Sequence, residues 1–436
     1  MWTATSMIVG ICVGSGIFFK VDDILKYTGG SVKLGVLVFI IGAFSIIFGS
    51  LSLTNLEAMT DNTGGMVAYF EDFFNKKIAS GFGWYQTFLY FPTVIAVVSW
   101  VSGIYTILLF ELPNTLNWQI AIGLVYLLTF YAINILSKTI GGHFQVVSSI
   151  IKLIPLLGVG IVAFFWHQAA PSVPQDIPIQ HTSNVGFGWL AALAPMAFSF
   201  DGWPIALSIS NEVKDSKKTM PKALILGPLI VLIVYLSYFL GMTHILGSEY
   251  ILSVGDGAVT KIGELLLGRS GEKILLFFVL ISVLGVVNGV ILAHLRMPKA
   301  LMTKQMLPVK QSKTKNPKAF ELHSALISFL VTISWYVIHY FTQKFGILPM
   351  GDISEIAVVF GYCFYITLYI KVFKMYRNQE IHHRFTGQIA PVLAVFGGLI
   401  IVLGGFTTSP IGLLFSFAIC SLIYFAGIKS YQKLNA

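Results

Sequence analysis

The 436-residue chain is 56% hydrophobic and only 11% charged, with a mean hydropathy of +0.80, whereas an ordinary soluble domain is about half apolar and a quarter charged. Apolar runs recur along the whole length, which excludes a soluble enzyme behind a cleaved signal peptide. The net charge of +9 does not indicate a nucleic-acid partner, because the basic residues lie between apolar runs instead of forming a stripe on a soluble domain.

Twelve apolar runs are long enough to cross a hydrocarbon core of ~30 Å. The sequence therefore predicts an all-α membrane protein with twelve transmembrane helices and the lipid bilayer as its surroundings. In chain order the predicted spans are 2–19, 34–56, 78–109, 118–136, 144–166, 187–210, 223–246, 274–295, 322–341, 353–370, 389–406 and 411–428. The longest connections, about 167–186, 247–273 and 296–321, are expected to be loops, and the first two are placed so that they could also cover a binding site.

The basic residues of the loops predict the orientation in the membrane. Of the 28 Lys and Arg residues, twenty lie in the even-numbered loops and the C-terminal tail, seven, including Lys20, lie in the odd-numbered loops, and Lys152 lies within a span. Because basic loops stay on the cytoplasmic side, both termini are expected in the cytoplasm. The expected location is the plasma membrane.

Helix 1 is predicted to be broken at 12–17, where Gly14, Ser15 and Gly16 interrupt an apolar run. Two glycines and a serine let the helix unwind and expose amide groups at the positive end of the following half-helix, which suits a carboxylate. The carbonyl groups around Cys12, at the end of the preceding half, suit an ammonium group. A face of small residues that packs against another helix is the alternative interpretation.

Helix 6 is predicted to be broken at 199–204, within Phe198-Ser199-Phe200-Asp201-Gly202-Trp203-Pro204. An acid, a glycine and a proline in mid-span are each unfavourable in an unbroken, lipid-exposed helix, so this backbone must line a cavity or be buried in protein. The aromatic residues could belong to the core, but beside a break they are placed to cover a bound substrate.

The two breaks lie five spans apart, and an odd offset reverses the orientation of a helix. This arrangement is typical of two inverted five-helix repeats with a discontinuous helix at corresponding places. The sequence predicts a first repeat over 1–166, a second, inverted repeat over 187–376, and two additional helices over 387–430.

Lys152 is the one basic residue deep in a span, about eight residues from one end and fourteen from the other. That is roughly 12–21 Å of hydrocarbon, more than a lysine side chain can reach across, so its ammonium group needs an internal partner. A site built of backbone carbonyls would provide one, and an ion pair with Asp201 or another buried acid is the alternative. Asn134 and Asn288 are expected to form inter-helix hydrogen bonds rather than to bind a ligand.

No enzymatic function, cofactor or metal site is predicted. The segment around Gly14 lacks the strand-to-helix context of a nucleophile elbow. The three cysteines lie within apolar runs without metal or disulfide spacing, and the nine histidines are scattered apart from His382 and His383.

At these residues the chain resembles the amino acid-polyamine-organocation superfamily, and within it the L-amino acid transporter group that includes the light subunits of animal heteromeric exchangers. The resemblance covers essentially the whole chain and is greatest to bacterial exchangers of alanine, serine, cysteine and threonine. Its motifs are GSGIF at 14–18, SSIIKLIP at 148–155, FSFDGWP at 198–204, NEVKDSKKTMPKAL at 211–224, VLGVVNG at 283–289 and HLRMPKAL at 294–301.

The resemblance implies the leucine-transporter fold. It implies a substrate carboxylate on the amides of Ser15, Gly16 and Ile17, beside Gly14, and a substrate ammonium on carbonyls around Cys12, Phe198 and Asp201, beside Ser199. It further implies that Phe198 is a gate and that Lys152 stands where sodium-coupled relatives bind a cation, bridging helix 5 to helices 1 and 8.

The function expected from this resemblance is sodium-independent exchange of small neutral L-amino acids. A proton-coupled symporter or uniporter is the closest alternative, and a channel or non-transporting sensor is the alternative from another class. The connection from Phe110 to Asn117 contains no cysteine, so no disulfide-linked heavy subunit is expected. The chain also begins almost at helix 1, which a trimmed or a very short native N-terminus would explain.

Overall fold

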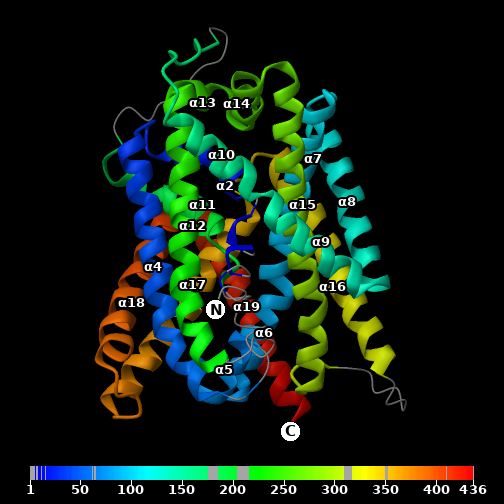
Figure 1. The fold of residues 1–436 in the computed structure, drawn as a ribbon. Coiled ribbons are helices and arrows are strands. Elements are labelled where there is room, and N and C mark those ends of the chain that lie inside the picture. Colours follow the sequence, from blue (N-terminus) through cyan, green and yellow to red (C-terminus); the bar gives the residue numbers. More distant parts are fainter. Residues whose placement is uncertain are drawn as a thin grey trace.

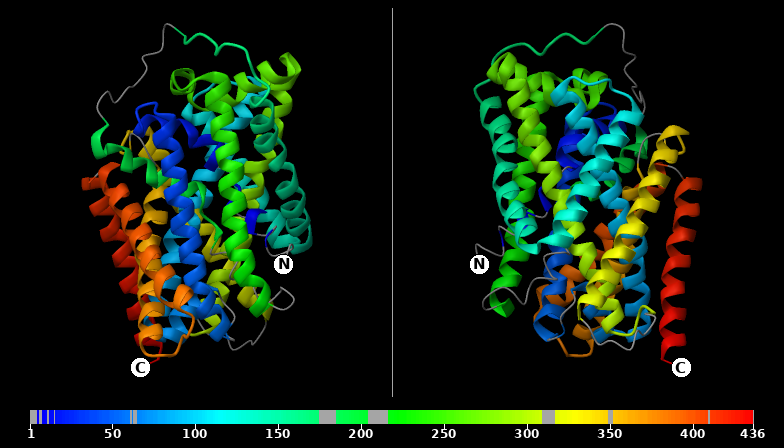
Figure 2. Two further views of the ribbon diagram at one scale, coloured as in Figure 1. Left: turned by 60° about the vertical axis from the view of Figure 1, so that its left-hand side comes forward. Right: turned by 90° about the vertical axis from the view of Figure 1, so that its right-hand side faces the viewer.

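The computed structural model describes residues 5, 8–10, 12–14, 16–60, 62, 65–174, 185–203, 216–308, 317–348, 352–408 and 410–435. Within these ranges the regular structure is entirely helical (Figure 1). Long helices run roughly side by side, and Figure 2 shows that α19 lies along the outside of the bundle.

The helices that follow the first span are, in chain order, α4 (Val32–Met59), α5 (Met66–Phe73), α6 (Lys76–Tyr85), η1 (Gln86–Tyr90), α7 (Phe91–Phe110), α8 (Leu116–Leu136), α9 (Lys138–Ile151), α10 (Leu153–Ala163), η2 (Gly186–Ala192), α11 (Leu193–Ser199), α12 (Ser216–Leu246), α13 (Ser248–Val254), η4 (Gly255–Gly257), α14 (Ala258–Leu267), α15 (Arg269–Thr303), α16 (Pro317–Lys344), α17 (Ile353–Arg377), η5 (Phe385–Ile389), α18 (Ala390–Thr408) and α19 (Pro410–Leu434).

Nine helical stretches within the described residues are long and apolar enough to cross a membrane. They coincide with the predicted second to fifth and seventh to eleventh spans, and α19 occupies the predicted twelfth. The protein is therefore an integral, multi-pass membrane protein. The first and sixth spans are described only in part, so the count of twelve and the inverted-repeat arrangement stay predictions.

Side chains that accept hydrogen bonds from backbone amides fix the starts of several helices. The Ser31 hydroxyl accepts from the Leu34 amide (3.4 Å) at the start of α4, and Asn75 accepts from the Ile78 amide (2.9 Å) at the start of α6. Such caps satisfy amide groups that have no partner within the helix. Asp352 caps α17 in the same way, through the Ser354 amide (2.8 Å).

The outer helices expose apolar side chains and the inner helices do not. In α8 the exposed residues include Val125 and Leu136, and in α16 they include Leu322 and Leu326, whereas most of α7 is buried. An apolar exterior is what a lipid-facing surface requires, because hydrocarbon does not solvate polar groups. The α7 helix is therefore held inside the bundle.

The connection expected as a loop over 247–273 is instead largely helical. It folds into α13, η4 and α14 at one end of the bundle, which is the end away from α5 and the C-terminus (Figure 1). Gly247 and Gly268, both with positive φ (77° and 73°), turn the chain into and out of these helices, a conformation that glycine adopts without strain.

The inter-helix hydrogen bonds predicted for Asn134 and Asn288 are confirmed, and the two residues bond each other. The Asn134 amide group donates to Asn288 Oδ1 (2.9 Å), and Asn288 donates to the Gly141 carbonyl (2.8 Å). Both asparagines are buried and join α8 and α9 to α15. They have structural partners, as the sequence predicted.

Candidate functional site

The first and sixth predicted spans are both interrupted part-way along their length. In the first, residues 8–10 and Cys12 are helical, Val13 and Gly14 form a bend, and α2 (Gly16–Phe19) and α3 (Val21–Tyr27) follow. In the sixth, α11 ends at Ser199 and the chain turns through Gly202, whose φ of 95° lies in the left-handed region. Ser15 and Pro204, named in the sequence analysis, lie outside the described residues.

The two interruptions lie against each other. A Cβ atom on Gly16 would be 2.6 Å from the Ser199 Cα atom, so only glycine permits this approach. The Tyr235 hydroxyl of α12 lies 2.8 Å from the Cys12 carbonyl and 2.7 Å from the Ser199 carbonyl. A hydroxyl has a single proton to donate, so it is shared between one carbonyl from each interrupted helix.

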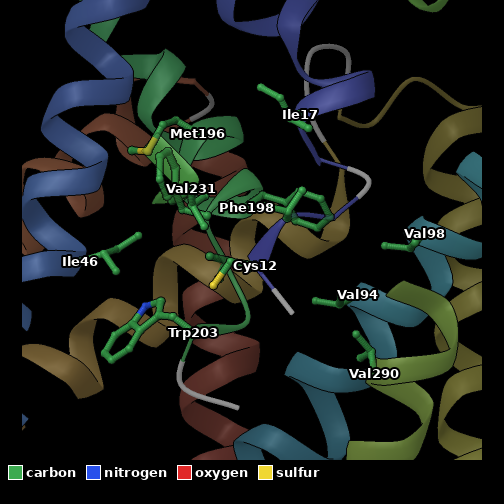
Figure 3. Packing of buried hydrophobic residues seen from close by; sticks show 14 of the residues in the cluster. Cys12, Ile17, Ile46, Val94, Val98, Met196, Phe198, Trp203, Val231 and Val290 are labelled. Carbon is green, nitrogen blue, oxygen red and sulfur yellow. The ribbon is translucent and has the colours of Figure 1, made fainter. Parts of the chain in front are cut away.

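A cavity opens between these interruptions and the helices around them. Figure 3 shows Val94 and Val290, from α7 and α15, opposite Cys12 and Phe198. The residues that line it are Cys12, Gly14, Gly16, Tyr90, Val94, Phe198, Ser199, Asp201, Gly202, Val286 and Val290. Six predicted site residues thus meet on one cavity: Cys12, Gly14, Gly16, Phe198, Ser199 and Asp201. Ile17 and Lys152 are buried but do not line it.

The Asp201 carboxylate is bound by a tyrosine. The Tyr90 hydroxyl donates to Asp201 Oδ2 at 2.5 Å, and Asp201 is only half-buried because it faces the cavity. A short hydrogen bond to an ionised acceptor is stronger than one between neutral groups. Tyr90 ends the π-helical segment η1, which directly precedes α7.

Lys152 lies at the junction of α9 and α10 and is 1% exposed. Its ammonium group donates a hydrogen bond to the Gly10 carbonyl of the first span. Among the ion pairs of the described ranges none joins Lys152 to Asp201, so the geometry favours a carbonyl partner over that carboxylate. The contact between this part of the fifth span and α15 is made by Ser148 of α9, which packs against Gly285 of α15.

A buried ionic cluster lies close to the Phe198 ring. Lys20, between α2 and α3, is 2% exposed, although the sequence analysis assigned it to a loop. Its ammonium group pairs with Asp352 (2.9 Å), Glu355 (2.5 Å) and Asp23 (3.3 Å). The same nitrogen lies 5.7 Å from the centre of the Phe198 ring. The cluster joins the first span to α17 on the side of the cavity toward α13, against which α3 packs.

Tyr90, Tyr235 and the role of Lys20 were not predicted from the sequence. A signal existed for the tyrosines, because a phenol hydroxyl deep in an apolar run needs a hydrogen-bond partner. The short run Lys20-Val21-Asp22-Asp23 has the composition of a solvated loop. Only its packing against α17, more than 300 residues later, identifies it as buried.

Comparisons with known proteins identify the family to which the chain is similar. The family model described as "Amino acid permease" matches residues 1–435. The serine/threonine exchanger SteT of Bacillus subtilis is 26% identical over 99% of this chain and 95% of its own length. The human Asc-type amino acid transporter 1 is 28% identical over 68% of this chain and 57% of its own length. The human cystine/glutamate transporter is 26% identical over 67% of this chain and 58% of its own length.

Proposed function

Because the chain belongs to the amino acid permease family of the amino acid-polyamine-organocation superfamily, we propose that it is a sodium-independent exchanger of small neutral L-amino acids. The observation that carries the proposal is the cavity between the two interrupted helices, lined by Gly14 and Gly16 on one side and by Phe198, Ser199 and Asp201 on the other. The Bacillus subtilis relative that matches this chain along nearly its whole length is a serine/threonine exchanger, and this supports the proposal.

The α-carboxylate and α-ammonium groups of the substrate bind to main-chain groups. Its carboxylate lies at the start of α2, on the amides of Ser15, Gly16 and Ile17, where the helix dipole is positive. Its ammonium lies on carbonyl groups around Cys12, Phe198 and Asp201. All amino acids can make these contacts, so the part of the cavity that holds the substrate side chain determines the substrate specificity.

Lys152 replaces a coupling cation. Its ammonium group is already bonded to the Gly10 carbonyl, at the break where a sodium ion would need carbonyl ligands. A positive charge fixed to the protein holds helix 1 without an ion from solution. Substrate binding then requires no sodium.

Alternating access requires a barrier that closes on each side of the cavity in turn. Phe198 and the ionic cluster of Lys20, Asp23, Asp352 and Glu355 form the barrier toward the α13–α14 end. The distribution of Lys and Arg among the loops predicts that this end faces the outside of the plasma membrane and that both termini lie in the cytoplasm. The protein works without a disulfide-linked heavy subunit.

The proposal is tested with purified protein in liposomes. Liposomes loaded with unlabelled serine are expected to take up labelled serine, and liposomes without internal amino acid are not. Replacing external sodium by choline is expected to change neither result. Uptake into empty liposomes that depends on sodium would contradict both exchange and the role of Lys152, and a current without substrate would indicate a channel.

A further inference from the structure

The π-helical turn of the third span, η1, is held by side chains from two other helices. We propose that His294 of α15 is a positioning residue for transport: its hydrogen bond to the Thr87 carbonyl keeps η1 in the form that directs the Tyr90 hydroxyl to Asp201. This inference rests on the proposed function. It adds to it a residue that acts on the substrate site without lining the cavity.

A proline explains why η1 needs hydrogen-bond donors from outside the span. The Phe91 amide donates to the Gln86 carbonyl, five residues earlier, which is the π-helical pattern. The next residue, Pro92, has no amide proton. The missing proton is the one that the Thr87 carbonyl would accept in a π-helix and the Phe88 carbonyl in an α-helix. A side-chain donor from a neighbouring helix can replace it.

Two side chains supply such donors, one to each of these carbonyls. His294 Nε2 lies 2.9 Å from the Thr87 carbonyl oxygen, and the Trp335 indole of α16 donates to the Phe88 carbonyl at 2.7 Å. A carbonyl oxygen only accepts hydrogen bonds, so His294 Nε2 carries the proton. The backbone of η1 is therefore tied to α15 and to α16.

The His294 ring is fixed on its other edge as well. The side chain is 0% exposed, and its ring stacks on Phe91, with 5.7 Å between the ring centres. Because Nε2 carries the proton, Nδ1 is an acceptor. The hydroxyls of Tyr131 and Thr332 each lie 3.3 Å from Nδ1. The ring is thus oriented so that Nε2 faces the turn.

The form of the turn determines where Tyr90 points. A π-helical turn holds more residues than an α-helical turn, and one residue corresponds to about 100° of rotation about the helix axis. Loss of the π-helical form would rotate α6 against α7, and Tyr90 lies at their junction. The 2.5 Å hydrogen bond from Tyr90 to Asp201 Oδ2 therefore depends on η1. Asp201 belongs to the segment whose carbonyls are proposed to bind the substrate ammonium, so η1 affects substrate affinity.

The test measures exchange of labelled serine by purified protein in loaded liposomes. His294→Leu removes the donor and keeps an apolar side chain. It is expected to raise the serine concentration for half-maximal exchange about tenfold, the order expected when a buried carbonyl loses its donor, with little change in the maximal rate per folded protein. His294→Gln, whose amide can donate to the same carbonyl, is expected to stay close to the wild type. A merely structural role would lower the amount of folded protein and leave this concentration unchanged.

A double variant tests whether His294 acts through Tyr90. Tyr90→Phe is expected to raise the half-maximal concentration by a similar factor, and adding His294→Leu should raise it no further, because both changes remove the same interaction. Tyr336→Phe is the matched control. The Tyr336 hydroxyl of α16 is buried and donates to the Ile120 carbonyl of α8 at 2.8 Å, so its loss leaves η1 intact and should not change the half-maximal concentration.

Three results would overturn the inference: an unchanged half-maximal concentration in His294→Leu, a His294→Gln variant that behaves like His294→Leu, or losses that multiply in the double variant. If His294→Leu does not fold, Trp335→Phe takes its place in the comparison with Tyr90→Phe, because it removes the second donor to η1 and keeps an aromatic ring. No exchange of any amino acid by the wild-type protein would instead refute the proposed function.

Discussion

Replacing Lys152 by methionine is expected to reduce alanine exchange by at least about tenfold, equivalent to about 1.4 kcal/mol. Methionine fills much of the same space but leaves the Gly10 carbonyl without its donor in a dry interior, and an unpaired buried polar group costs about 1–3 kcal/mol. Gly10 lies in the helical segment before the bend at Val13 and Gly14, and the amides proposed to hold the substrate carboxylate follow that bend. The loss should therefore appear in substrate affinity or in the return step, which equilibrium binding and exchange rates separate.

Two further variants decide what the Lys152 effect means. Ser149 also approaches the Gly10 carbonyl, at 3.5 Å, but bonds Gln145 more closely at 2.7 Å, so Ser149→Ala is a control that should retain exchange. If Lys152 only neutralises Asp201, combining Lys152→Met with Asp201→Asn should restore alanine exchange, since both buried charges disappear together. Recovery in that double variant, or full activity in Lys152→Met, would contradict the cation-replacement role.

Replacing Lys20 by methionine is expected to open the barrier between the cavity and the α13–α14 end of the bundle. The change leaves Asp352 and Glu355 buried without their cation, and removing one partner of a buried ion pair costs about 3–5 kcal/mol. The state closed at the α13–α14 end should lose population. The measurement is the rate at which a thiol reagent, added from that side, modifies Cys12 in the cavity wall, and we expect it to rise at least about tenfold.

The neighbouring Lys26 provides the control for Lys20. It pairs with Asp22 (2.7 Å) and Asp23 (3.2 Å) within α3 and is more exposed, with 31% of its side chain accessible. Lys26→Met removes the same charge from ion pairs that lie within α3, so modification of Cys12 should stay near the wild-type rate. Equal acceleration in both variants would mean that α3 is merely destabilised, and no acceleration in Lys20→Met would refute the barrier.

Much of the fold could be predicted from the sequence because membrane spans are local signals. A run of about 20 apolar residues identifies a span wherever it lies in the chain, and the nine spans found within the described residues were each predicted. The helices over 248–267 were not, because they are short and lie among polar residues and glycines that are also typical of loops.

Only the part of the candidate site that is formed by the two helix breaks could be predicted from the sequence. Gly14, Gly16 and Asp201 are unusual within apolar spans, so each indicates a break without knowledge of its neighbours. Tyr90 and Lys20 gain their roles from partners far along the chain, Asp201 and Asp352, and no local pattern specifies such pairs.

Substrate protection of Cys12 tests most directly whether the cavity is the amino acid site. Cys12 is the only cysteine among the lining residues, so Cys363 and Cys420 can be replaced by alanine to leave a single target. Serine at about ten times its dissociation constant is expected to slow modification of Cys12 about tenfold, because it occupies most of the sites. Modification at an unchanged rate in protein that still exchanges serine would place the substrate elsewhere and contradict the account.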